Sequence, residues 1–258
     1  KTMSIYTQND STWFLCTYNG IYLTLDYGEN WLPFGQTIPT LQINDMTINK
    51  NDNSLFASTD LGLYKSSDNG LTWNLLLNNY GYRVVSIGDT IIYLAKNGNF
   101  QKITRSTDNG SNWTDNNLGD FSGMIYQTTE GILFLEWHFF DTSRLYKSLN
   151  GGGSWGMIYQ NQPSISWGPV ISNTNNSLVM QRKTKHNLFT DVSLMVSFNN
   201  FLNSTVYNVW IFDVGNSSIN SLFCNLSETI FAGLKDGKIR KISGIILTDI
   251  DEEPVNNP

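Results

Sequence analysis

Short runs in which apolar and polar residues alternate recur along the whole chain, separated by turn residues. Such alternation predicts half-buried β-strands, for example over 43–48, 54–59, 83–87 and 90–95. Further runs of this kind, at 62–66 and 144–148, lead directly into turns rich in Asn, Asp and Gly. The pattern therefore predicts an all-β chain built from hairpins.

One turn sequence is repeated at even spacing. Its copies occupy 24–31, 66–73 and 106–113, with a weaker copy at 148–155 and a remnant at 197–200 that has lost its Gly and Trp. The tryptophans that end the four fuller copies are 42, 40 and 42 residues apart, which is the length of a four-stranded propeller blade. Two strand-like runs precede each hairpin, so we expect four strands in each repeat.

The repeated turn has a physical interpretation. Its acidic or amide side chain can accept hydrogen bonds from the amides of the turn, its Gly tolerates a positive φ, and its Trp can pack under the turn. These structural roles are expected for Asp26, Trp31, Asp68, Trp73, Asp108, Trp113, Asn150 and Trp155.

The pattern S/T-x-D-x-G-x-x-W resembles the Asp-box (BNR) repeat of sialidase-like propellers, sortilin-type receptors and photosystem II assembly-factor propellers. The resemblance covers most of the chain and implies a β-propeller. In those families the Asp-box is a structural turn away from the face that usually binds ligands. The resemblance thus implies a folding role, rather than catalysis or metal binding, for Asp26, Asp68 and Asp108.

The repeat divides the chain into six expected blades. They form a single propeller over 1–250, with blades at about 1–36, 37–79, 80–118, 119–162, 163–215 and 216–250, followed by an acidic, Pro/Asn-rich tail or linker at 251–258. How the ring closes is left open. The same holds for a disulfide between Cys16 and Cys224, which would require the first and last blades to be neighbours.

Composition narrows the partners. The 258 residues include 16 Lys+Arg and 22 Asp+Glu, a net charge of −6, and charged residues make up only 15% of the chain, while 32 Asn supply much of the polar surface. An acidic chain without a run of Lys and Arg residues lacks the basic surface that binds the phosphates of nucleic acids. It has no apolar stretch long enough to span a membrane and no apolar signal segment at its start. We expect the mature form of a secreted or bacterial surface protein.

Catalytic interpretations are weaker. Residues 152–156 match the G-x-S-x-G nucleophile pattern, but they lie in a hairpin turn rather than between a strand and a helix. With only His138 and His186, a three-histidine metal centre is impossible, so no metal and no cofactor are expected. Glu130 and Glu136 are possible carboxylates for a glycosidase, although solvated strand positions are the better interpretation.

A sialidase-like glycoside hydrolase is the alternative that the resemblance itself suggests. Such enzymes bind the substrate carboxylate with three arginines, and the family's first arginine segment is absent because the first blade contains no Arg. We therefore expect a non-enzymatic binding or scaffolding propeller, whose ligand is a glycan or a protein. Its oligomeric state is left open.

The expected binding face is the one opposite the repeated turns. Long connections around Trp137 and Lys185 should carry aromatic and charged groups there, since long loops on a rigid scaffold commonly bear binding residues. The candidate ligand-binding residues are Tyr80, Tyr82, Arg83, Glu136, Trp137, His138, Trp167, Lys185 and His186. The alternative for Trp137 is that it packs between blades.

Overall fold

The computed structural model describes residues 2–35, 37–40, 42–128, 131–140, 142–161, 165–172, 178–185, 190–197, 207–209, 219–224, 230–234 and 239–242. The secondary-structure elements assigned in these ranges are all β-strands, so the prediction of an all-β chain is confirmed. The chain divides into two compact units. Lys1–Ile125, Gly131–Phe139 and Tyr146–Gly156 form the first unit, and Tyr126–Glu130, Phe140–Leu145 and Met157–Pro258 form the second.

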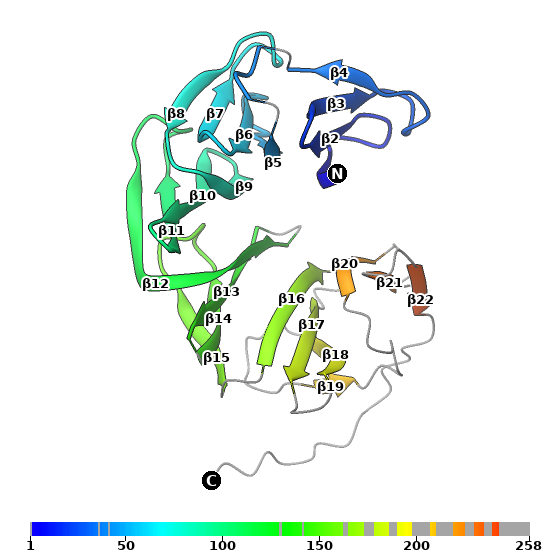
Figure 1. Cartoon of the computed structure of the whole chain (residues 1–258), viewed down its shortest axis with the longest axis vertical. Helices are drawn as coiled ribbons and strands as arrows, with labels where there is room; N and C mark the ends of the chain where they lie inside the picture. Colours follow the sequence, from blue (N-terminus) through cyan, green and yellow to red (C-terminus); the bar gives the residue numbers. More distant parts are fainter. Residues whose placement is uncertain are drawn as a thin grey trace. The chain divides into compact units, whose positions relative to one another are not determined.

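The first unit begins with two four-stranded antiparallel sheets whose strands follow chain order (Figure 1). The first sheet contains β1 (Thr2–Thr7), β2 (Trp13–Thr17), β3 (Gly20–Thr24) and β4 (Leu32–Phe34). The second contains β5 (Ile43–Ile48), β6 (Leu55–Thr59), β7 (Leu63–Ser66) and β8 (Asn74–Leu77). Strands β5 and β6 agree with the runs expected from the alternation.

The next sheet has seven strands. In sheet order from β9 to β15 these are β9 (Gly81–Ile87), β10 (Thr90–Asn97), β11 (Phe100–Ser106), β12 (Thr114–Gln127), β13 (Leu133–Phe139), β14 (Thr142–Ser148) and β15 (Gly156–Asn161). The expected blade boundary at 118/119 lies inside the 14-residue β12. Between its pairs with Ile103 and Gln101, β12 bulges, and Gly119 there has a φ of 73°. With this bulge, one continuous strand pairs with β11 on one side and with β13 on the other.

The second unit contributes two further antiparallel sheets. One contains β16 (Ile165–Ser172), β17 (Leu178–Lys185), β18 (Thr190–Ser197) and β19 (Tyr207–Val209). The other contains β20 (Ile219–Cys224), β21 (Ile230–Leu234) and β22 (Ile239–Ile242). The blade ranges and the number of blades stay predictions.

The core of the first unit lies between neighbouring sheets. Cys16 and Ile21 of the first sheet pack with Ile43 and Met46 of the second. Phe56 and Leu63 of the second pack in turn with strands β9 and β10. Cys16 is a free thiol, and its burial raises its pKa to about 12. Packing of sheet against sheet therefore holds this unit together.

The second repeated turn is closed by its own side chains. The Asp68 carboxylate accepts hydrogen bonds from the Thr72 amide at 2.9 Å, from the Thr72 hydroxyl and from the Ser66 hydroxyl at 2.7 Å. The Gly70 amide donates to Ser66 Oγ at 2.8 Å, and the Trp73 indole N–H donates to the Gly70 carbonyl at 3.2 Å. The turns around Asp26 and Asp108 repeat these bonds. The expected hydrogen-bonding role of the Asp is thus seen in three copies.

The fourth copy keeps the bonds around the Asp position without a carboxylate, although its Trp155 indole N–H has no hydrogen-bond partner. Asn150 Oδ1 accepts from the Ser148 hydroxyl at 3.0 Å and from the Ser154 amide at 2.9 Å. Its Nδ2 donates to the Ser154 hydroxyl at 2.9 Å. The turn therefore depends on an acceptor at this position rather than on a charge.

Two successive residues of each turn have positive φ, a conformation that suits Asn and Gly. The values are 55° and 80° for Asn69 and Gly70, and the third and fourth copies behave alike. In the first copy the first of these two positions is held by Tyr27, with a φ of 62°. A tyrosine there is strained relative to the Asn of the second and third copies.

The second and third turns also fasten their sheets to the sheet before, which the repeat alone did not predict. A Cβ on Gly70 would lie 2.4 Å from the Phe34 ring, and one on Gly110 would lie 2.9 Å from Leu76. Basic side chains link successive turns: Lys65 Nζ of the second sheet donates to the Asn109 carbonyl at 2.8 Å, and within the seven-stranded sheet Arg105 Nε donates to the Gly151 carbonyl at 2.7 Å. In both cases the residue before the turn's Ser binds the next turn along the chain.

Candidate binding site

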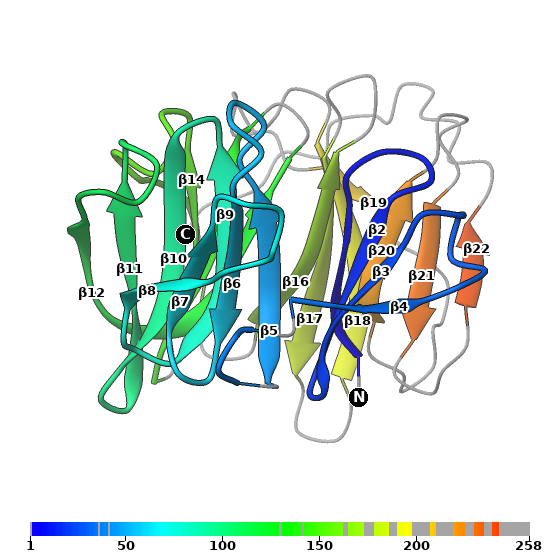
Figure 2. The same ribbon diagram turned by 90° about the horizontal axis from the view of Figure 1, so that it is seen from above.

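Successive connections of an antiparallel sheet lie at alternate ends of its strands. The β1–β2 and β2–β3 connections accordingly lie at opposite ends of the first sheet (Figure 2). The first three repeated turns share one end with the β1–β2, β5–β6 and β9–β10 connections. The fourth lies at the same end, because Arg105 next to the third turn donates to the Gly151 carbonyl at 2.7 Å. We call the other end of the strands in the first unit the opposite end. The candidate ligand-binding residues of this unit are expected there.

Tyr80 and Tyr82 form an aromatic pair at the opposite end, where the chain enters β9. Their ring centroids are 5.1 Å apart and the ring planes are inclined by 57°. Gln42 Nε2 donates to the Tyr80 hydroxyl at 3.0 Å and to Asn44 Oδ1 at 3.2 Å. Both rings are half-buried. The pair thus offers partly accessible aromatic surface beside an amide.

Arg83 follows this pair on β9 and faces β5. Its Nε lies 3.7 Å from Asp45 Oδ2, which also accepts a hydrogen bond from the Val84 amide at 3.1 Å. Burial raises the pKa of Asp45, and the Arg83 cation and the Val84 N–H oppose that shift. The Arg83 side chain is 33% exposed whereas that of Asp45 is 11% exposed. The Arg83 side chain is therefore partly accessible, whereas its Nε is buried beside the Asp45 carboxylate.

The structure places Trp137 in a strand and not in a long connection, so that expectation is wrong. The indole is 6% exposed, and its N–H donates to the Leu118 carbonyl at 3.2 Å. Its ring lies 6.1 Å from Phe139 and 6.5 Å from Tyr146. An indole gains more from burial with its N–H satisfied than from exposure at a loop tip, which explains why the chain continues as β13.

The neighbours of Trp137 on β13 form a pair of their own. Glu136 is 6% exposed, so the interpretation of Glu136 as a solvated strand residue is also wrong. Its Oε1 lies 2.7 Å from His138 Nε2. Glu136 and His138 are adjacent in space because residues two apart on a strand point to the same side.

The remaining candidates lie in the second unit. Trp167 is in β16 opposite Arg182, and Lys185 is the last residue of β17, opposite Thr190. Only the backbone of both is described. His186 and Glu130 lie outside the described residues. The structure therefore brings together Tyr80, Tyr82 and Arg83, and separately Glu136, Trp137 and His138, although Tyr82 packs against the apolar cluster that contains Trp137.

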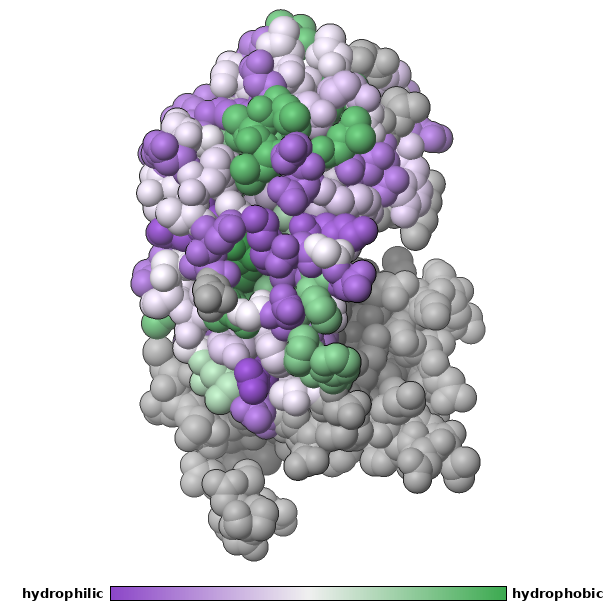
Figure 3. Space-filling model, turned by 60° about the vertical axis from the view of Figure 1, so that its left-hand side comes forward, coloured by the Kyte–Doolittle hydropathy of each residue, from purple (hydrophilic) through white to green (hydrophobic). Residues whose placement is uncertain are grey.

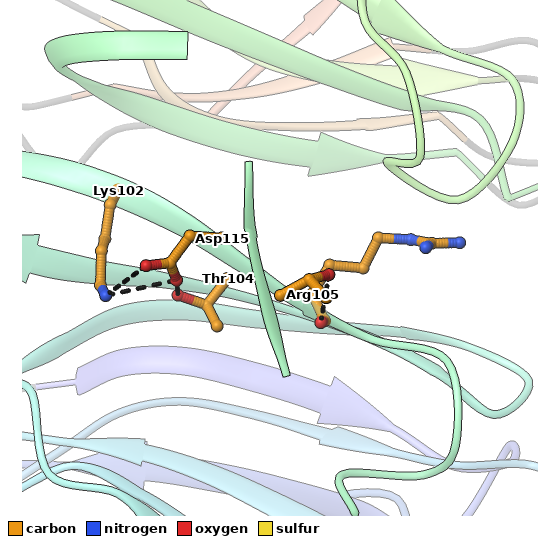
Figure 4. Close-up of polar contacts among 5 residues, drawn as sticks. Lys102, Thr104, Arg105 and Asp115 are labelled. Atoms are coloured by element: carbon orange, nitrogen blue, oxygen red, sulfur yellow. Dashed lines mark hydrogen bonds and ion pairs between the residues drawn. The ribbon is translucent and has the colours of Figure 1, made fainter. Parts of the chain in front are cut away.

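A surface carboxylate on β12 is already satisfied (Figure 4). Lys102 Nζ lies 3.0 Å from Asp115 Oδ2, and the Thr104 hydroxyl donates to Asp115 Oδ1 at 2.8 Å. The Arg105 side chain points away from this group. Within the described ranges no three His, Cys, Asp or Glu side chains gather in a way that could hold a metal ion. The same part of the chain contains no helix suited to crossing a membrane.

Sequence reasoning missed Gln42, Asn44 and Asp45, which support the Tyr80 pair and Arg83. Asn44 Nδ2 donates to the Gly81 carbonyl at 2.7 Å, so these side chains join β5 to β9. The one available signal was Asp45, an acidic residue inside an otherwise uncharged strand. Such a residue requires a partner when it is buried.

Comparison with known proteins shows similarity of fold. No protein-family model matches the chain, and no curated protein matches it. Among solved structures, an ancestral GH74 enzyme superposes with a TM-score of 0.69 at 15% identity, over 93% of this chain and 37% of that one. The extracellular domain of BT4673 from B. thetaiotaomicron gives 0.65 at 15% identity, over 94% and 33%. The present chain thus spans about a third of either protein.

A third similar structure is close to this chain in length. YCF48 from Cyanidioschyzon merolae superposes with a TM-score of 0.64 at 13% identity, covering 93% of this chain and 81% of that one. These neighbours are propellers. The chain accordingly has a β-propeller fold, as the spacing of its tryptophans predicts.

Proposed function

We propose that the chain is a non-enzymatic binding propeller, secreted or displayed at a cell surface, that holds a protein or glycan ligand at the opposite end. In this proposal its repeated turns are structural Asp-boxes, and about six four-stranded blades form the ring. The same proposal makes Tyr80, Tyr82 and Arg83 the ligand-binding residues of the first unit. Trp167, Lys185 and His186 are the candidates of the second unit, to be tested separately.

The observation that carries the proposal is the Tyr80–Tyr82 pair with its support. Two half-buried rings, an amide from Gln42 and a partly exposed arginine side chain are held by side chains of the neighbouring sheet. Aromatic surface beside a few fixed polar groups suits a sugar ring or a peptide side chain. None of these groups is needed to close a turn, in contrast to the repeated Asp residues.

The comparisons support a binding role without identifying the ligand. One similar structure is YCF48 bound to a D1 peptide, with a TM-score of 0.57 at 12% identity. That protein favours a protein ligand here, and the extracellular domain of BT4673 favours an exported location. A glycan remains the second class of ligand to be tested.

The test begins with the labelled protein on a glycan array and a peptide array. For any ligand that binds, Tyr80→Ala and Tyr82→Ala should weaken affinity about tenfold. The matched control is Tyr18→Ala, an exposed tyrosine at the same end of the first sheet, which should leave affinity unchanged. Loss of affinity in the control alone would place the site elsewhere.

The same protein should be incubated with a panel of fluorogenic glycosides, because a glycoside hydrolase is the competing function. Turnover that exceeds the background rate and disappears in Glu136→Gln would contradict the proposal. We expect none, since Glu136 is buried against His138 and the Asp45 carboxylate is buried against Arg83.

A further inference from the structure

Tyr27 is the most unusual exposed residue of the first unit. It has a φ of 62°, which bulky side chains rarely adopt, and its side chain is 66% exposed. The same turn position holds Asn69 and Asn109 in the next copies, and these suit that backbone. The fold therefore gains little from a tyrosine here. A strained backbone that supports an exposed aromatic ring indicates use in binding.

Other exposed apolar side chains gather around the repeated turns. Six of the nine exposed large hydrophobic residues of the first unit lie in a turn or in the strand that follows it. They are Leu25, Tyr27, Leu32, Leu71, Leu75 and Leu149. Hydrophobic patches are visible among hydrophilic residues on the described surface (Figure 3). Isolated exposed leucines are ordinary, but four of these nine residues, Leu25, Tyr27, Leu71 and Leu149, lie in the repeated turns themselves, and such grouping is a mark of an interaction surface.

We define the turn face as the four repeated turns (24–31, 66–73, 106–113 and 148–155) with the adjoining connections 8–12, 49–54 and 88–89. Strand register places each of the first three turns beside a connection, since Thr24 pairs with Trp13, Ser66 with Leu55 and Ser106 with Ile91. Direct contacts join the third turn to both of its neighbours: Asn109 bonds to Asp52 and to the Asp89 carbonyl.

The turn face is strongly acidic. Its acidic residues are Asp10, Asp26, Glu29, Asp52, Asp68, Asp89 and Asp108, against the single base Lys50, so its formal charge is 1 − 7 = −6. Adding Lys65 and Arg105, whose side chains reach turn carbonyls, still leaves −6 + 2 = −4. The connections of the first unit at the opposite end contain only one charge, that of Asp60.

We propose that the turn face binds a basic, amphipathic polypeptide segment, with Tyr27 as the aromatic anchor. Apolar side chains of the segment would cover Tyr27, Leu25 and Leu71, and its Lys or Arg residues would meet the surrounding carboxylates. An anionic membrane surface would be repelled by the same charge. This second surface is independent of the proposed site at the opposite end, so either can fail alone.

The test uses a fluorescent synthetic peptide made only of leucine and lysine, and its binding to the whole chain is followed by fluorescence anisotropy at low and physiological salt. Control peptides replace lysine by glutamate, or leucine by serine. We expect only the leucine–lysine peptide to bind, and to bind more weakly as salt increases. No binding of that peptide, or equal binding of the serine–lysine peptide, would overturn the proposal.

Variants locate the surface. Tyr27→Asn, which puts the residue of the second and third turns at this position and so preserves the fold, should weaken peptide binding about tenfold. Asp10→Asn with Glu29→Gln should weaken it about threefold and flatten its salt dependence. The matched controls Tyr18→Asn and Asp60→Asn, at the opposite end, should leave affinity unchanged. Equal losses in the controls would show unspecific attraction and overturn the proposal.

The same variants also test two other occupants of the turn face, a second copy of the chain and a lipid membrane. Sedimentation across a range of concentrations would reveal self-association, and vesicles of phosphatidylcholine would reveal binding to lipid. If Tyr27→Asn abolished either one, a second copy or a membrane would be the true occupant and the peptide proposal would be wrong.

Discussion

The two ends of the strands in the first unit are stabilised in different ways. At the turn face, each turn closes through bonds within eight successive residues, and the bond from a backbone amide to the Asp or Asn side chain recurs in all four copies. At the opposite end, Tyr80 depends on Gln42, Arg83 on Asp45 and Trp137 on the Leu118 carbonyl. The first end is thus built from local sequence, and the second from contacts between distant residues. Substitutions at the two ends should therefore differ in kind.

The largest effect is expected at the opposite end. Trp137→Ala removes a buried indole and should lower the free energy of unfolding by about 3–5 kcal/mol. The control on the same hairpin is Phe140→Ala, since Phe140 is 86% exposed and should change that free energy by less than about 0.5 kcal/mol. Denaturant unfolding measures both. Similar small effects would mean that Trp137 is dispensable to the core and available for binding.

Alanine substitutions at two glycines, one at each end of the strands, compare the ends directly. Both have positive φ, 80° at Gly70 in the turn and 60° at Gly98 at the opposite end. A Cβ on Gly70 would meet the Phe34 ring at 2.4 Å, whereas one on Gly98 would meet nothing within 4 Å. Gly70→Ala should therefore destabilise by about 2–4 kcal/mol, and Gly98→Ala by about 1 kcal/mol from backbone strain alone.

Chemical denaturation of the two alanine variants side by side measures this difference. Equal losses would show that the turn does not pack tightly on the preceding sheet. They would also remove the argument that the repeated turns fasten one sheet to the next.

The difference between the ends also explains how far sequence could predict the structure. The turn around Asp68 is specified by residues at most five positions from it, so the repeat was sufficient to predict its bonds and the strands on either side. Trp137 could not be placed in the same way, because its environment consists of Leu118, Phe139 and Tyr146. The long β12 was missed since no local signal ends or begins a strand at its bulge.

A substitution at Tyr27 should test the turn face by an increase, rather than a loss, of stability. Tyr27→Asn places a residue that tolerates positive φ in a position with a φ of 62°, and should raise the free energy of unfolding by about 1 kcal/mol. The control is Asn69→Tyr, which makes the reverse change in the second turn and should destabilise by a similar amount. Thermal or denaturant unfolding measures both. A Tyr27→Asn variant that is less stable than the parent would mean that the ring packs against the fold.

The smallest effect at neutral pH is expected for Asp68→Asn, because the fourth turn already closes with Asn150. Acid should reveal the difference. Hydrogen bonds from the Thr72 hydroxyl and amide hold the pKa of Asp68 at about 2, below its ordinary value of 3.8. A carboxyl whose folded pKa is depressed stabilises the fold above its unfolded pKa, and this contribution is lost as the pH falls through the folded pKa. The parent should therefore lose stability between about pH 4 and pH 2, and Asp68→Asn should lose less over that interval.

Urea unfolding at a series of pH values measures both slopes, with Asn150→Asp as the reverse control that should steepen the loss. Parallel slopes in all three proteins would show that the turn carboxylates are held no more tightly in the folded chain than in the unfolded one.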